Sequence, residues 1–259
     1  MLLVDYVVPS VAVDETLINA FTILMILYVP VYVILRRILK NKYSWETFTR
    51  MVSLCNASQC IYIVFRYVLP NYTNYFDLNE LGTPDLIRGL YWFAAYLLVD
   101  GIFYLPDFLT RPTVQMFTTV AHHFVGGFGM YLIAEARMGL GLGSYFAWTE
   151  ISTPLLHMSW ILYTNQNVNK WATSVFITFY LVFGLSRIAT IPVLLSYINM
   201  NKDLIAQETT IHRWMAYLGS WTLIGLNSVW FIMLTIKAAK MLCPIERRVN
   251  FIWVNFFLG

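Results

Sequence analysis

Eight ionisable side chains lie inside long apolar segments of this sequence, and their chemistry could serve a function. They are Arg66, Arg88, Asp100, His122, His123, Glu150, His157 and Arg187. An ionisable group in hydrocarbon is costly, so such groups usually face the interior of a helix bundle or a cavity. These residues therefore mark where a site should lie.

Their positions along the segments divide these residues into two layers, because each residue of a helix advances about 1.5 Å. The histidine layer is expected to contain Asp100, His122, His123 and His157. The arginine layer, in the other half of the membrane, is expected to contain Glu150, Arg187, Arg66 and Arg88. Each layer brings side chains from several helices to one depth, as a shared site requires.

The histidine layer has the residue types of general acid–base catalysis. Histidine titrates near neutrality, and Asp100 could orient a neighbouring ring and raise its basicity. Adjacent residues such as His122 and His123 point about 100° apart on a helix, so we expect one ring to face a cavity while a neighbouring helix holds the other. The alternative is a polar network that only holds helices together.

A metal site is not predicted. The usual helical metal pair is His-x-x-x-His, which places both rings on one face, and His122-His123 lacks that spacing. The three cysteines, Cys55, Cys60 and Cys243, show neither the spacing of metal ligands nor a disulfide framework. They are interpreted as small packing residues in apolar surroundings.

The arginine layer is expected to be a structural ion pair between Glu150 and either Arg187 or Arg66. A carboxylate at that depth needs a partner, because an unpaired charge in hydrocarbon is expensive. Glu150, Pro154 and His157 follow an i, i+4, i+7 spacing and therefore share one face of their helix.

The elements that must position these residues are membrane-spanning helices. Of the 259 residues, 59% are hydrophobic and only 12% are charged, whereas soluble domains carry about 25% charged residues. A span needs roughly 20 mainly apolar residues. Seven segments meet this description, at about 17–35, 51–70, 86–105, 116–134, 144–163, 171–197 and 214–236. The predicted fold is an all-α integral membrane protein with seven transmembrane helices.

The charged residues predict how the chain lies in the membrane. Basic residues gather in the loop that contains Arg36 to Arg50 and near the C-terminus, from Lys237 to Arg248. With seven spans both regions lie on one side, and positive loops favour the cytosolic or matrix side. The N-terminus is therefore expected to be lumenal or exterior. The net charge of only +3 gives no support for a nucleic-acid partner.

Several short motifs together resemble the TLC-domain family, over about residues 45 to 235. They are Trp45 with Arg50 and Val52-Ser53, Tyr96 to Asp100, His122-His123, Glu150 to Pro154 with His157 and Trp160, Arg187 with Pro192, and Asn227 with Trp230. The resemblance implies six helices in a barrel around a lipid-sized cavity, with the first span as an extra helix. Residues 1–44 would form the N-terminal helix and basic loop, residues 45–240 the TLC-like domain, and residues 241–259 an interfacial tail.

The chain departs from the pattern of the family in two places. Asn56 stands where many members carry histidine, three residues after Ser53. Ceramide synthases carry a longer acidic pattern after the histidine pair, whereas Ser144 to Trp160 contains only Glu150. The chain therefore resembles the smaller TLC-domain proteins, which are implicated in membrane lipid composition, more than it resembles ceramide synthases.

Three functions remain open from the sequence. The first is a protein of membrane lipid homeostasis that binds or senses a lipid or acyl chain in its cavity. The second is an acyltransferase that takes acyl-CoA as co-substrate, without a further cofactor, and uses Asp100, His122 and His123. The third is a structural subunit that fills a lipidic gap in a larger membrane complex. Glu150, His157, Arg187, Arg66 and Asn227 are expected to line or brace the cavity. Family analogy favours the endoplasmic reticulum or endomembranes, with the mitochondrial inner membrane as the alternative.

Overall fold

The computed structural model describes residues 11–40, 42–68, 84–110, 112–136, 140–164 and 169–242, which contain helices and no strand. The first half comprises α1 (Val11–Tyr32) with η1 (Val33–Ile38), α2 (Lys42–Ile63) with η2 (Val64–Val68), α3 (Pro84–Thr110) and α4 (Val114–Ala136). The second half comprises α5 (Leu140–Thr149), η4 (Glu150–Ser152), α6 (Thr153–Thr164), α7 (Asn169–Phe183), η5 (Gly184–Ile188), α8 (Ile191–Met200), α9 (Lys202–Gln207), α10 (Thr210–Trp214), η6 (Met215–Gly219) and α11 (Ser220–Leu242).

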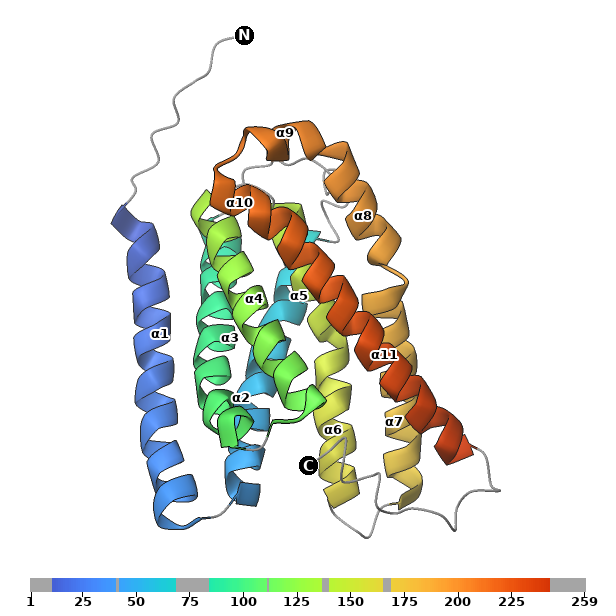
Figure 1. Cartoon of the computed structure of the whole chain (residues 1–259). Helices are drawn as coiled ribbons and strands as arrows, with labels where there is room; N and C mark the ends of the chain where they lie inside the picture. Colours follow the sequence, from blue (N-terminus) through green and yellow to red (C-terminus); the bar gives the residue numbers. More distant parts are fainter. Residues whose placement is uncertain are drawn as a thin grey trace.

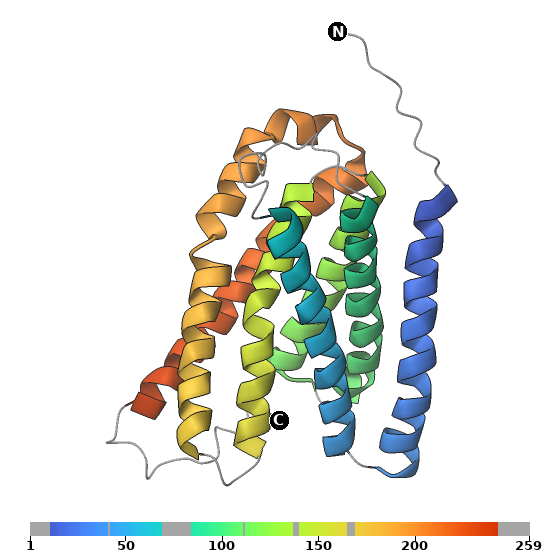
Figure 2. The same cartoon turned by 180° about the vertical axis from the view of Figure 1, so that it is seen from behind.

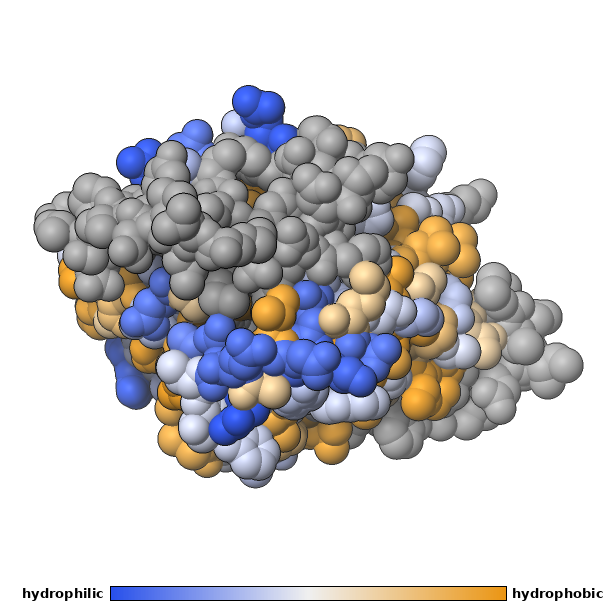
Figure 3. All heavy atoms as spheres, turned by 90° about the horizontal axis from the view of Figure 1, so that it is seen from above, coloured by the Kyte–Doolittle hydropathy of each residue, from blue (hydrophilic) through white to orange (hydrophobic). Residues whose placement is uncertain are grey.

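The long helices form one bundle, with α1 along its outer edge and α11 crossing it diagonally (Figure 1). The upper end of the bundle carries α9 and α10, and α1 joins α2 at the lower end. From behind, α2 slants between α3 and α6 (Figure 2). Seen from the upper end, hydrophilic side chains lie beside hydrophobic ones (Figure 3).

Four helical stretches in the described residues are long and apolar enough to cross a membrane: Thr16–Ile38, Pro84–Thr110, Trp171–Met200 and Thr210–Ala239. The three other predicted segments are also helical and correspond to α2 with η2, to α4, and to α5, η4 and α6. These three carry polar residues such as Asn56, His122 and Glu150, which lower their hydropathy. An all-α membrane architecture suits this pattern, because a helix satisfies its own backbone hydrogen bonds in lipid.

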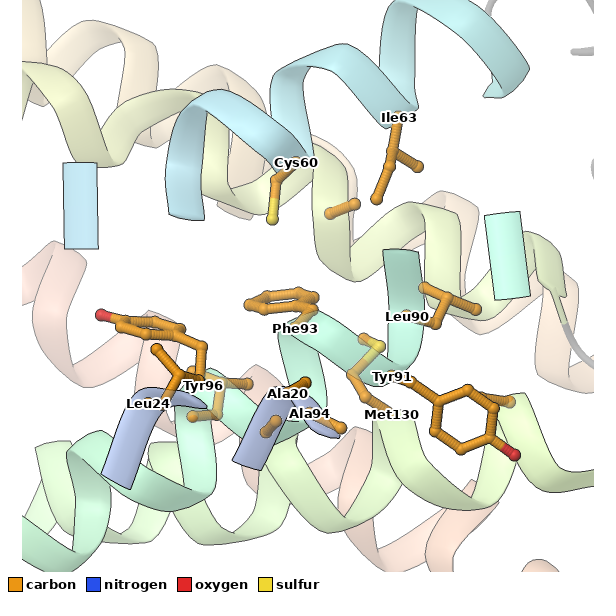
Figure 4. Close-up of a cluster of buried hydrophobic side chains, with 14 of the residues drawn as sticks. Ala20, Leu24, Cys60, Ile63, Leu90, Tyr91, Phe93, Ala94, Tyr96 and Met130 are labelled. Atoms are coloured by element: carbon orange, nitrogen blue, oxygen red, sulfur yellow. The ribbon is translucent and has the colours of Figure 1, made fainter. Parts of the chain in front are cut away.

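Helix α3 lies in the interior of the bundle. In its most apolar stretch 72% of the residues are buried, against 17% in the N-terminal span. Helix α1 meets it through Ala20, Leu24 and Tyr28, which are spaced by four residues and so lie on one face. Figure 4 shows this cluster, in which Ala20 and Leu24 face Ala94 and Tyr96 of α3.

Helices α3 and α4 approach each other closely at the glycines of α4. A Cβ atom at Gly127 would lie 2.9 Å from Cγ of Leu98, and one at Gly126 would lie 3.2 Å from Cδ1 of Leu97. Small residues permit such close packing between membrane helices. This contact holds His123, four residues before Gly127 on α4, against α3.

Candidate functional site in the bundle interior

Asp100 of α3 is buried between α1 and α4. The Tyr28 hydroxyl donates a hydrogen bond of 2.8 Å to Oδ1 of Asp100, and Nδ1 of His123 lies 3.4 Å from Oδ2. The three side chains are all buried. They form a continuous polar chain across three helices, so both carboxyl oxygens of Asp100 have a polar neighbour.

Tyr28 is a site residue that the sequence reasoning did not identify. It lies on the first span, outside the resemblance to the TLC family, and its ring also packs against Phe103 and Phe48 with centroid distances of 5.2 Å. A signal was available. Tyr28 is the polar-tipped member of the stripe formed with Ala20 and Leu24, and a buried tyrosine hydroxyl usually has a partner.

The two histidines of α4 have different surroundings. His123 is held beside Asp100 and packs edge-on against Tyr104 at 5.8 Å. His122 packs edge-on against Trp230 of α11 at 5.2 Å, and its Nε2 lies 4.0 Å from Oε1 of Glu150. Among the described residues Nδ1 of His122 has no hydrogen-bond partner although it is buried. His122 therefore has unused hydrogen-bonding capacity.

Glu150 and Arg187 form a buried ion pair with a distance of 3.1 Å between Oε1 and Nη2. Arg187 also donates to Oδ1 of Asn227 at 3.3 Å and to the Ser152 hydroxyl at 3.3 Å. The Thr153 hydroxyl donates to the second carboxyl oxygen of Glu150 at 2.6 Å. A buried ion pair is tolerated when further hydrogen bonds satisfy the remaining groups, and here they do.

Irregular helical turns carry both members of this ion pair. Glu150 begins the 3₁₀ turn η4, just before Pro154, and Arg187 lies in the π turn η5, before Pro192. Isolated turns of this kind are frequent at functional sites because they change the direction of side chains.

His157 of α6 contacts α2 instead of the histidine pair. Its Nε2 lies 2.8 Å from the Ser53 hydroxyl, and its Nδ1 lies 3.4 Å from Nη1 of Arg50. Arg50 in turn lies over the ring of Trp160, 4.1 Å from its centroid.

The structure differs from the two-layer expectation in two respects. Arg66 and Arg88 are exposed and do not line the interior site, and Arg88 contacts Asp85 at 3.5 Å. The layers are also not separate, because His122 reaches Glu150. Counting residues along segments ignores helix tilt and rotation. The buried face of α2 and η2 includes Cys60, Ile63 and Val64, and Arg66 of η2 is exposed.

A cavity of about 280 Å³ connects these groups. A cavity of roughly 10–15 Å³ is enough for one water molecule, so this cavity has room for a much larger guest. Its polar lining includes Asp100, His122, His123, Glu150 and Arg187, and its apolar lining includes Leu97, Leu156, Phe176, Phe179, Phe183 and Met233. The lining residues come from α2, α3, α4, η4 with α6, α7 with η5, and α11, and α1 contributes none of them.

The cavity extends from the Glu150–Arg187 pair toward the lower end of the bundle. Its lining there includes Glu46 near the start of α2, Asp107 near the end of α3, Gln115 at the start of α4 and Lys237 toward the end of α11. We call these residues, together with Arg50, the cavity mouth. Asp107 is paired with Arg36.

We find no candidate set of metal ligands in the described residues. Within the part of the chain that the structure describes, no group of three or more histidine, cysteine, aspartate or glutamate side chains is arranged to hold a metal ion. The arrangement offers an imidazole beside a carboxylate, and an apolar chamber that ends in polar groups.

A family model for the TLC domain matches residues 46–236, which is most of the chain. The chain belongs to the TLC-domain family. No curated protein and no solved structure matches it. Family membership and the apolar helices together make it an integral membrane protein of a family linked to lipid function. Tyr28 and Ala20 of α1 lie before the matched region, so the partner of Asp100 comes from outside the TLC domain.

Proposed function

We propose that this TLC-domain protein binds a lipid acyl chain in its interior cavity and contributes in this way to membrane lipid homeostasis. The observation that supports the proposal is the cavity, with its aromatic and aliphatic walls and a few convergent polar groups. Small-molecule sites commonly have this composition, in which the apolar walls provide affinity and the polar groups fix orientation.

The six elements that line the cavity would form the barrel of the TLC domain, with α1 outside it. In this arrangement the acyl chain contacts Phe176, Phe179 and Phe183. A polar group within the guest, such as the ester of its acyl chain, can form a hydrogen bond at His122, whose Nδ1 has no partner among the described residues. The Glu150–Arg187 pair closes the cavity on its inner side.

The test is to fill the cavity and count bound lipid. Leu156→Trp places a large ring in the cavity, whereas Met158→Trp places the same ring on the exposed side of α6. Native mass spectrometry of the purified full chain should find retained lipid in the wild type and in Met158→Trp, and little in Leu156→Trp. Equal lipid retention in the two variants would overturn the proposal.

Acyl transfer is the second candidate, and the contact between Asp100 and His123 favours it. A histidine oriented by a carboxylate is the usual general base of acyl transfer. His123 would take the proton of an acceptor hydroxyl or amine while the oxygen or nitrogen attacks the thioester carbonyl of an acyl-CoA. The C–S bond then breaks, and the proton passes to the departing thiolate.

Acyl transfer has its own test, because binding alone gives no turnover. The purified chain would be incubated with a labelled acyl-CoA and a lipid extract, and the acylated products would be separated. Release of free thiol together with a labelled lipid in the wild type, and loss of both in His123→Gln, would support the enzyme. Absence of labelled product with all acceptors would leave lipid binding as the function.

The structural-subunit alternative predicts a core filled by side chains, and the 280 Å³ cavity does not favour it. For location we propose the endoplasmic reticulum or another endomembrane, with the N-terminus lumenal and the cavity mouth on the cytosolic side. The basic residues at the lower end support this orientation.

A further inference from the structure

We propose that the cavity mouth binds the phosphate of the lipid whose acyl chain occupies the cavity, through Arg50 and Lys237. The ligand class is then an anionic phospholipid. This inference deepens the proposed lipid-binding function and depends on it.

The first observation is that both cations lie in the lining of the cavity. Arg50 is on α2 and Lys237 is on α11, and both are partly buried. An arginine or lysine near the end of a membrane helix usually extends to the bulk headgroup region. Here the two side chains lie at the edge of an interior chamber, so a ligand in the chamber can meet them.

The second observation is that neither cation forms an ion pair within 4.0 Å of a carboxylate among the described residues, although Glu46 and Asp100 are near enough to Arg50 to interact with its charge. Arg50 contacts the ring of Trp160 and His157, and its Nε is buried without a hydrogen-bond partner in the described chain. Lys237 lies over two rings, 4.7 Å from the centroid of Phe176 and 5.2 Å from that of Tyr163. Aromatic rings hold a cation in place without neutralising it.

The third observation is that both cations contact aromatic rings of α6. Their aromatic contacts, Trp160 and Tyr163, are one turn apart on α6 and therefore near one another on its surface. Two cations positioned in this way could clamp one phosphate, since arginine supplies several donors in a fixed plane and lysine a compact point charge.

The acidic residues of the mouth limit where the anion can lie. Asp107 is paired with Arg36. Glu46 lies four residues before Arg50 on α2 and lines the same mouth. A phosphate would therefore sit on the side of Arg50 that faces α6 and α11, away from Glu46.

The experiment measures binding of two lipids with identical acyl chains, one anionic and one zwitterionic. The full chain would be reconstituted in phosphatidylcholine nanodiscs and titrated with fluorescent phosphatidic acid or with phosphatidylcholine bearing the same label. Wild type should bind phosphatidic acid about ten-fold or more tightly than phosphatidylcholine. Arg50→Gln and Lys237→Gln should each weaken phosphatidic acid binding by about ten-fold to a hundred-fold, as expected for loss of a charged hydrogen bond, with little change for phosphatidylcholine.

The matched controls are Arg88→Gln and Lys202→Gln, which remove exposed cations of the same two types. Both controls should bind phosphatidic acid as the wild type does. Equal losses in the controls would show that only the general charge of the protein matters and would overturn the site. An unchanged affinity in Arg50→Gln and Lys237→Gln would overturn it as well.

Two further results separate this inference from the proposed function. If the wild type binds both lipids equally and Leu156→Trp abolishes binding, the cavity holds lipid but the phosphate site is wrong. If the wild type binds neither lipid, the proposed function itself fails. Excess inorganic phosphate should not displace the lipid, because it lacks the acyl chain, and displacement would indicate a site for free phosphate instead of a lipid headgroup.

Discussion

The hydroxyl of Tyr28 donates a 2.8 Å hydrogen bond to the Asp100 carboxylate, so a helix outside the TLC domain reaches the aspartate beside its histidine pair. The bond fixes one carboxyl oxygen and leaves the other toward His123, 3.4 Å away. The first helix is therefore more than a membrane anchor in this chain, because it supplies a polar contact inside the bundle.

Loss of this hydroxyl should destabilise the protein. Tyr28→Phe keeps the ring against Phe103 but removes the donor to Asp100, and leaving a buried acceptor unsatisfied costs about 1–3 kcal/mol. Thermal unfolding in detergent would measure the loss. The matched control is Tyr32→Phe, since Tyr32 packs on the same Phe103 ring at 5.3 Å. Equal stability of the two variants would contradict a role for the hydrogen bond.

The Glu150–Arg187 pair should be strongly coupled. Glu150→Leu leaves the Arg187 guanidinium buried without its carboxylate, which typically costs about 3–5 kcal/mol. A double substitution, Glu150→Leu with Arg187→Met, should recover part of that loss because no unpaired charge remains. The exposed pair of Arg88 and Asp85 is the control, and Arg88→Met should cost about 0–1 kcal/mol. If Glu150→Leu unfolds with the same free energy as the wild type, the pair contributes nothing to folding.

The two histidines should respond differently to substitution. His123→Ala removes a ring packed between Tyr104 and Asp100, so it should lower thermal stability more than His122→Ala does. His122→Ala should instead change which lipid is retained, because Nδ1 of His122 is a buried nitrogen of the cavity lining without a hydrogen-bond partner among the described residues. Lipid analysis of the purified variants checks this. Unchanged lipid content in His122→Ala would exclude that side chain from ligand contact.

An enzyme would give a further signature at His123. If the protein transfers acyl groups, loss of the general base should lower turnover by roughly 10²–10⁴-fold. Lipid binding should persist in such a variant if only the chemical step is lost. His123→Gln is preferred to alanine for this measurement because it retains more of the side-chain volume.

The orientation in the membrane can be tested by cysteine labelling. In a background with Cys55, Cys60 and Cys243 replaced by serine, Lys42→Cys should react with an impermeant reagent only from the cytosolic or matrix side. Lys202→Cys, in α9 at the other end of the bundle, should react from the lumenal or exterior side. The reverse pattern would invert the proposed topology.

The sequence was sufficient for the class of fold, the family and the identity of the acidic, basic and histidine side chains that are buried in the described residues. A continuous apolar run of about 20 residues indicates a membrane-spanning helix, which satisfies its own backbone hydrogen bonds, and this rule needs no tertiary information. The order of short motifs, from Trp45 to Trp230, pointed to the TLC family, and the family match over residues 46–236 confirms that resemblance. The expectation that Glu150 has a basic partner also followed from the cost of burying a charge.

Tertiary structure decided which of those polar residues meet. Counting residues placed Arg66 beside Glu150 and kept His122 in a different layer, but helix rotation exposes Arg66 and brings His122 to 4.0 Å from Glu150. The stripe of Ala20, Leu24 and Tyr28 marks a buried tyrosine, but its partner Asp100 lies 72 residues away on another helix, so the pairing itself could not be read from the sequence. The apolar pattern of a segment and the cost of burying a charge in it depend on that segment alone, so both can be read along the chain. Helix tilt, rotation and irregular turns depend on packing between segments, so only the folded bundle determines them.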